Sequence, residues 1–202
     1  MKDLNKRVKG EWGYISYQRK RVLLITLVLY VCAIGIYLFG YFSLNTPKNM
    51  FTIIAVLSIL PASKSMVNLI MFLRFRSLPA DIHKSYSEHA GDMCIIYEMP
   101  FTTYEKTYYV EASVCKNKTL ICSYPPGNSG NKGSGVNGTQ DIKKLTEHLM
   151  GVIGNEGYKD ITVKVYGKRE DFIKRTDELS DLKAQDIKAD RSVLDTLLSV
   201  VL

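Results

Sequence analysis

Two long apolar segments near the N-terminus constrain this chain more than any other feature. Residues 22–42 are 21 residues without a charge, which as a helix span about 31 Å and match the hydrocarbon thickness of a bilayer. Residues 51–73 are a second apolar segment, with Pro61 and Lys64 near its middle. The stretch between them, SLNTPKNM, is typical of a tight turn. The sequence therefore predicts a transmembrane helical hairpin over residues 22–73, with the lipid bilayer as its first partner.

The second apolar segment carries a polar face. Pro61, Lys64, Ser65 and Asn68 recur at spacings of three and four, so they lie along one side of a helix. A lysine in hydrocarbon costs about 2.5 to 3.5 kcal/mol on insertion scales, which indicates a partner, a cavity or a function. We expect this face to meet a protein partner or a second copy of the chain, or to line a cavity. The alternatives are a small transport or pore subunit, a lysine that snorkels, and a helix that is interfacial from Pro61 onward.

The net charge of +7 is confined to the N-terminal third of the chain. Residues 1–21 carry +5, Lys48 and Lys64 add +2, and residues 74–202 balance 18 basic against 18 acidic side chains. The C-terminal part therefore gives no bulk charge signal for nucleic acid. Because basic residues flank the hairpin and the turn holds only Lys48, the positive-inside rule predicts a two-span membrane protein with both termini in the cytoplasm.

Residues 1–21 combine basic and aromatic side chains, as segments at a membrane surface do. The alternative is an unstructured basic tail that only sets the orientation. The predicted interface anchors are Trp12, Tyr14, Tyr17, Arg19, Lys20 and Arg21.

Residues 74–91 are predicted to be a linker with a short solvated helix after Pro79. Its two histidines, His83 and His89, are six residues apart and fit no common metal-ligand spacing. The four cysteines include no CxxC pair, and in a cytoplasmic domain they are expected to be reduced. The sequence thus predicts no metal site and no cofactor.

Residues 92–202 are predicted to form an α+β domain. Residues 93–99, 106–115 and 119–124 are rich in strand-forming residues and predict an antiparallel meander, with a turn at 100–103. A glycine-rich loop at 125–138 lacks the order of a P-loop. A helix over 139–153, a strand over 161–166 that joins the sheet in parallel, and helices over 168–183 and 190–202 complete a mostly antiparallel four-stranded sheet with about three helices.

This order of elements, a leading helix followed by three strands, a helix and a strand, is similar to the core of the restriction-endonuclease-like fold. The resemblance is topological and covers roughly residues 80–166. It implies a carboxylate on the second strand, for which Glu111 stands, and a Glu-x-Lys on the third. The third strand, TLICSY, has no acidic residue, so the catalytic set of that family is missing.

The predicted function is therefore a membrane-anchored cytoplasmic scaffold or interaction domain, with no catalytic residue assigned. The alternative from the enzyme class is a membrane-tethered, degenerate nuclease-fold hydrolase whose acids come from positions such as Glu98 and Glu111.

Overall fold

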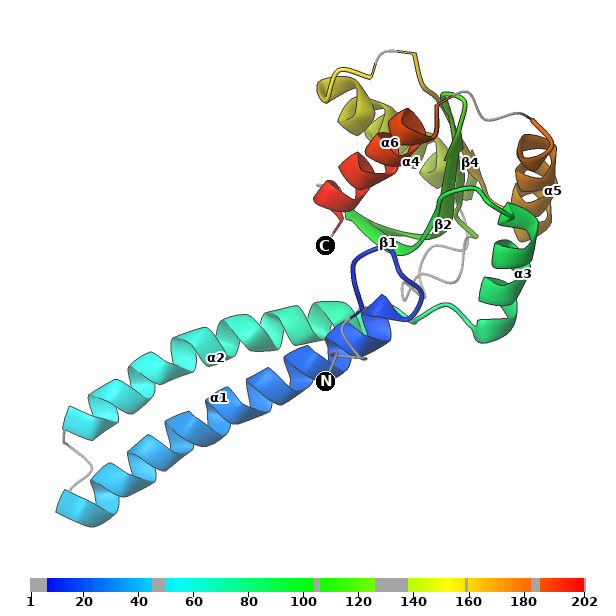
Figure 1. The fold of residues 1–202 in the computed structure, drawn as a ribbon. Coiled ribbons are helices and arrows are strands. Elements are labelled where there is room, and N and C mark those ends of the chain that lie inside the picture. The colour runs from blue at the N-terminus through cyan, green and yellow to red at the C-terminus, as the bar shows by residue number, and fades with distance from the viewer. Residues whose placement is uncertain are drawn as a thin grey trace. The chain divides into compact units, whose positions relative to one another are not determined.

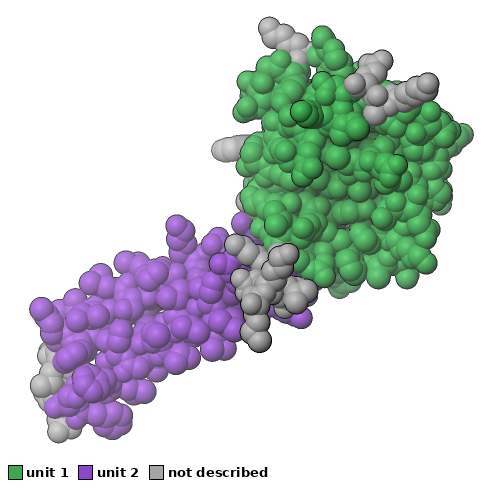
Figure 2. Space-filling view, in the orientation of Figure 1, with its two compact units in different colours: residues 1–14, 75–202 green, residues 15–74 purple. Residues whose placement is uncertain are grey.

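The computed structural model describes residues 7–44, 50–103, 106–125, 138–158, 160–182 and 186–201. The chain divides into two compact units, which Figure 2 colours separately. Residues 15–74 are here called the hairpin, and residues 1–14 with 75–202 are called the sheet domain. Most of the predicted loop at 125–138 and of the predicted turn at 43–50 lies outside the described residues.

The hairpin consists of two long helices, α1 (Tyr14–Leu44) and α2 (Met50–Arg74). Both are long and apolar enough to cross a membrane, and only 11% of the most apolar window of each is buried. A core helix of a water-soluble protein would be mostly buried, whereas large apolar side chains are exposed along both of these helices. The prediction of two apolar helices near the N-terminus is thus confirmed.

Small and hydroxyl-bearing residues line the buried side of the hairpin. They recur at intervals of four and seven residues, so they form one stripe on each helix. The buried members are Val22, Thr26, Ala33 and Gly40 on α1, and Ala55 and Ala62 on α2. α2 continues through Pro61 without a break, although proline cannot donate to the Leu57 carbonyl.

The sheet domain is built on a four-stranded mixed sheet in the order β1-β2-β3-β4 (Figure 1). The first three strands are an antiparallel meander, and β4 pairs with β3 in parallel, as predicted. A parallel neighbour requires a crossover connection, which contains α4. The strands are β1 (Ile95–Thr102), β2 (Thr107–Lys116), β3 (Thr119–Ser123) and β4 (Thr162–Tyr166).

Helices cover both faces of this sheet (Figure 1). Side chains of α4 and α6 pack on one face with residues such as Leu120 and Val163. Side chains of α3 and α5 pack on the other face with residues such as Val114 and Ile121. The helices are α3 (Ala80–Ala90), α4 (Gly138–Asn155), α5 (Arg169–Ser180) and α6 (Ile187–Val200).

Two details differ from the sequence prediction. The segment predicted to be a solvated linker supplies α3, whose Tyr86 is fully buried, so it belongs to the core of the sheet domain. The predicted turn at 100–103 is mostly strand, because Pro100 pairs with Tyr109 and Phe101 is buried within β1. β1 is an edge strand, where a proline without an N–H is tolerated.

Residues just before α1 cover the free edge of β1. The Gly10 carbonyl accepts a hydrogen bond of 2.8 Å from the Tyr97 N–H, and Lys9 Nζ donates to the Val201 carbonyl at 2.7 Å. Gly10 has a φ of +87°, and a Cβ there would lie 2.9 Å from a Leu198 methyl carbon. A glycine therefore allows the close approach that protects this edge.

Candidate functional site

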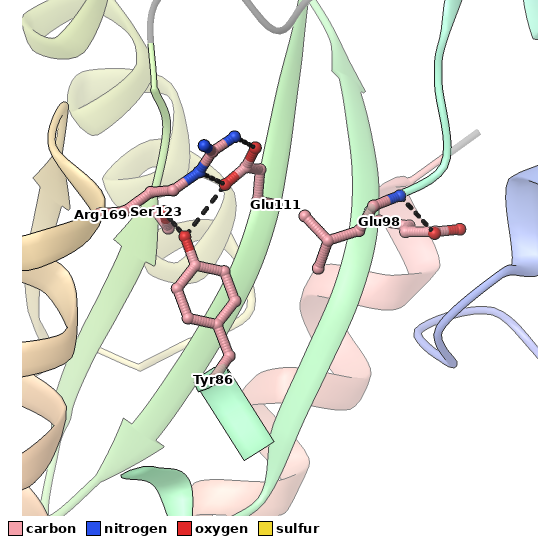
Figure 3. Close-up of polar contacts among 6 residues, drawn as sticks. Tyr86, Glu98, Glu111, Ser123 and Arg169 are labelled. Atoms are coloured by element: carbon pink, nitrogen blue, oxygen red, sulfur yellow. Dashed lines mark hydrogen bonds and ion pairs between the residues drawn. The ribbon is translucent and has the colours of Figure 1, made fainter. Parts of the chain in front are cut away.

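A buried carboxylate, Glu111, is the centre of a polar cluster in the sheet domain (Figure 3). It lies on β2 and is 0% exposed. Arg169, the first residue of α5, donates from Nε to Oε2 at 2.9 Å and from Nη2 to Oε1 at 2.6 Å. This two-pronged pairing is the geometry in which a guanidinium binds a carboxylate most strongly.

Tyr86 and Ser123 extend this cluster from two further elements. The Tyr86 hydroxyl donates to Glu111 Oε2 at 3.0 Å and lies 2.9 Å from the Ser123 hydroxyl oxygen. Burial raises the pKa of Tyr86 far above its usual range, so the hydroxyl keeps its proton and remains a donor. The cluster therefore links α3, β2, β3 and α5. Arg169, Tyr86 and Ser123 were not predicted from the sequence.

Glu98 is directly opposite Glu111 in the β1–β2 register, between the pairs Tyr97↔Ala112 and Met99↔Val110. Its φ is +53°, an unusual value for a residue with a side chain. At this point the regular alternation of side chains between the two faces of the sheet is interrupted. Tyr97 and Ala112 pack on the α3/α5 side, while Met99 and Val110 pack on the α4/α6 side.

This irregularity directs the two opposed carboxylates apart (Figure 3). Glu98 Oε1 accepts a hydrogen bond of 2.9 Å from the Leu78 N–H and another from the Ser77 hydroxyl. Each glutamate thus has its own donors, and the structure does not bring the two acids of the hydrolase alternative into one site. In the structure, Glu98 connects the sheet to the segment before α3, and Glu111 connects the sheet to α5.

The four residues of the predicted intramembrane polar face do not all point the same way. The Ser65 hydroxyl oxygen lies 2.7 Å from that of Thr26 on α1, so Ser65 is directed into the hairpin. Pro61, Lys64 and Asn68 are exposed on the outer surface of α2.

The predicted interface anchors also separate into two groups. Trp12 belongs to the sheet domain, where its indole N–H donates to the Leu78 carbonyl at 2.8 Å and its ring stacks on His83 at 4.7 Å. Tyr14 is buried at the start of α1. The others follow in the first turns of α1: Tyr17 and Arg19 are partly exposed, and Lys20 and Arg21 are exposed.

The stacked pair of Trp12 and His83 should give a fluorescence signal that depends on pH. Burial lowers the pKa of His83, with Arg7 acting in the same direction and Glu98 opposing it. Trp12 is the single tryptophan, so we expect its fluorescence to fall on acidification with a midpoint below the usual histidine pKa of about 6.5, since a stacked imidazolium quenches indole. Because the folded state favours the neutral ring, His83 contributes fully to the stability of the fold above the pKa that it has in the unfolded chain. This contribution is lost as the pH falls through the lower pKa that His83 has in the folded chain.

A fluorescence titration of the full chain checks this prediction. His83→Asn should abolish the transition, whereas His89→Asn, which removes a ring paired with Asp177 at 2.7 Å, should leave it unchanged. A midpoint above 6.5, or a transition that survives His83→Asn, would contradict the stacking.

A cavity of about 450 Å³ lies in the sheet domain between the ends of α3 and α5 and the start of α6. Its polar lining includes Cys94, Cys115, Lys116 and Asp190. Asp190 Oδ2 accepts from the Asn117 N–H at 3.2 Å, and the Cys115 thiol donates to Asp190 Oδ1 at 3.7 Å. Lys116 Nζ donates to the Ser180 carbonyl at 3.1 Å. Asp190 and Lys116 are therefore engaged with the protein.

The thiols of the sheet domain should differ in reactivity. Burial raises the pKa of Cys115 and, to about 12, that of Cys122, whereas Cys94 is partly exposed. In a Cys32→Ser background, we expect a thiol reagent to modify Cys94 in the folded chain and the other two only after unfolding, because the thiolate is the reactive form. Mass spectrometry of the modified peptides measures this. Equal modification of all three thiols in the folded chain would be inconsistent with the buried core.

Within the described parts of the chain, no group of three or more His, Cys, Asp or Glu residues is arranged to hold a metal ion. Comparison of the chain with protein-family models, with curated proteins and with solved structures gives no match.

Proposed function

We propose that this chain is a membrane-anchored scaffold. In this proposal the hairpin crosses the bilayer twice, and the sheet domain lies in the cytoplasm and recruits a partner protein. The observation that supports the proposal is the row of large apolar side chains exposed along both hairpin helices, a kind of surface that water-soluble monomers rarely expose. The orientation rests on the basic residues that flank the hairpin.

The chemistry of the sheet domain supports a non-catalytic role. Both carboxylate oxygens of Glu111 accept hydrogen bonds from Arg169. The Glu98 carboxylate accepts hydrogen bonds from the Leu78 N–H and the Ser77 hydroxyl. A hydrolytic site needs carboxylates that converge on one metal ion or one water molecule. These two carboxylates instead diverge and hold the fold together.

A second candidate is the degenerate nuclease-fold hydrolase. It is favoured by the strand order β1-β2-β3-β4 with a parallel β4, which fits a restriction-endonuclease-like topology with Glu111 on its second strand. It is opposed by the lack of an acid on β3, where Ser123 contacts Tyr86 instead.

Calorimetric titration of the full chain with Mn²⁺ in a mild detergent separates the two proposals. The scaffold proposal predicts the same heats for the wild type and for Glu111→Gln, with no saturable binding. Saturable binding that is lost in Glu111→Gln and retained in the surface variant Glu178→Gln would support the hydrolase and contradict the scaffold.

A further inference from the structure

Lys64 lies on the outer side of the hairpin. It is two residues from Ala62, which is fully buried, and at about 100° per residue this places it on the opposite side of α2. Exposed apolar residues such as Leu57 and Leu60 surround this side. Whatever neutralises Lys64 must therefore approach from outside the hairpin.

The contact between Ser65 and Thr26 fixes how deep Lys64 lies. Thr26 follows Arg21, the last charge before the apolar part of α1, by five residues. Lys64 is one residue farther from the basic end than Ser65, which places it about 9 Å inside the level of Arg21. Side chains in a helix tilt toward its N-terminus. The Lys64 side chain therefore points away from the basic C-terminal end of α2 where it leaves the backbone. This direction opposes snorkelling.

Three hydroxyl groups of the hairpin form hydrogen bonds with carbonyl groups of their own helices. Thr26 donates to the Val22 carbonyl at 2.8 Å, Ser58 to Ile54 at 2.8 Å and Ser63 to Ile59 at 2.9 Å. Such bonds satisfy a hydroxyl in a lipid environment. Among the described side chains on the outer side of α2, the Lys64 ammonium and the Asn68 amide remain to be satisfied, four residues apart on one face.

The chain contains no acidic residue between Glu11 and Asp81. A second copy therefore has no carboxylate to offer in its spans, and it would oppose one lysine with another. We infer that the hairpin docks through Lys64 and Asn68 on a membrane-spanning helix of a different protein, which carries an aspartate or glutamate at the same depth. This inference rests on the proposed function and names the chemistry of the partner. One carboxylate accepts from both the ammonium and the amide, which satisfies both groups.

Energy transfer between the labelled full chain and labelled synthetic helices in phosphatidylcholine vesicles tests this inference. The probes are leucine-rich spanning helices with glutamate, leucine or lysine six residues from one charged end. The wild type should bind the glutamate helix about three- to thirtyfold more tightly than the leucine helix, the range expected for polar contacts inside a membrane. Lys64→Glu should instead prefer the lysine helix.

The matched control moves the charge without removing it. Lys64→Leu combined with Ser63→Lys keeps a lysine at nearly the same depth but turns it about 100° around α2. This variant should lose the preference for the glutamate helix, as Lys64→Leu alone should. Asn68→Leu should reduce the preference, and Lys48→Leu, outside the predicted spans, should leave it unchanged.

Several results would overturn the inference. They are equal binding of the glutamate and leucine helices by the wild type, a preference that survives in the shifted-lysine variant, and self-association that depends on Lys64. A dependence on Lys64 that appears only when anionic lipid is added would assign it to lipid headgroups instead. Flotation with the vesicles tests the anchor separately, because a wild-type chain that does not float would contradict the proposed function as well.

Discussion

Arg169→Ala is expected to lower the free energy of unfolding of the sheet domain by about 3 kcal/mol, the lower end of the range for breaking a buried ion pair. The substitution leaves Glu111, which is 0% exposed, without the guanidinium that binds both its oxygens. The lower end applies because the Arg169 side chain is itself 36% exposed, so water can partly replace it. Arg169→Lys should restore only part of the loss, since an ammonium cannot donate from two fixed nitrogens.

Urea unfolding of the full chain in a mild detergent, followed by Trp12 fluorescence, measures this loss. Trp12 contacts the sheet domain through Leu78 and His83, so it reports on that unit. Arg175→Ala is the matched control, because Arg175 is on the same helix but pairs with the half-exposed Glu178. The control should cost no more than about 1 kcal/mol. Equal losses in the two variants would show that the Glu111 cluster does not stabilise the fold.

Phe172→Ala is expected to destabilise the sheet domain by about 3 to 5 kcal/mol, as for other buried phenylalanines. Phe172 is 0% exposed and contacts the Tyr86 ring edge-to-face, with ring centroids 5.1 Å apart. Its loss leaves a cavity between α5 and the sheet and loosens the tyrosine that donates to Glu111. The same unfolding experiment gives the value, with the partly buried neighbour Ile173→Ala as the milder control.

Because Phe172 and Arg169 act on one cluster, their effects should not be additive. The double variant is expected to lose less stability than the sum of the two single losses. A strictly additive result would mean that the aromatic contact and the ion pair are independent. A loss below about 1 kcal/mol for Phe172→Ala would contradict the packing of α5 on the sheet.

Local sequence patterns predicted most of the elements. The two apolar segments, the strand-forming stretches and the helical stripes in residues 139–202 each carry a signal within a dozen residues, and the structure confirms their type. The parallel pairing of β4 followed from its crossover connection. Their exact ends were less predictable, as Pro100 illustrates, because an edge strand accepts a proline that usually indicates a turn.

The candidate site was less predictable because its contacts join residues far apart in the sequence. Arg169 is 58 residues from Glu111, and no periodicity indicates that the first turn of α5 reaches β2. The positive φ of Glu98 has no local signature, since the residue is neither glycine nor asparagine. Trp12 lies in a basic, aromatic segment typical of a membrane surface, and the sequence gives no sign of its contacts with Leu78 and His83 in the sheet domain.

The hairpin was predicted well in outline and less well in detail. Spacing alone placed Ser65 on the same face as Lys64, but helix periodicity does not say where the neighbouring helix lies. The contact with Thr26 separates the two, because it turns Ser65 inward and leaves Lys64 outside. This division is what allows the outer face to be considered as a docking surface.

Reporter fusions test whether the hairpin crosses the membrane twice and leaves the sheet domain in the cytoplasm. A reporter enzyme that is active only outside the cytoplasm can be fused after Asn45, between the two apolar segments, and in a second fusion after Leu202. We expect an active reporter at Asn45 and an inactive one at Leu202. An active reporter at Leu202 would place the sheet domain outside the cytoplasm and contradict the proposed membrane topology.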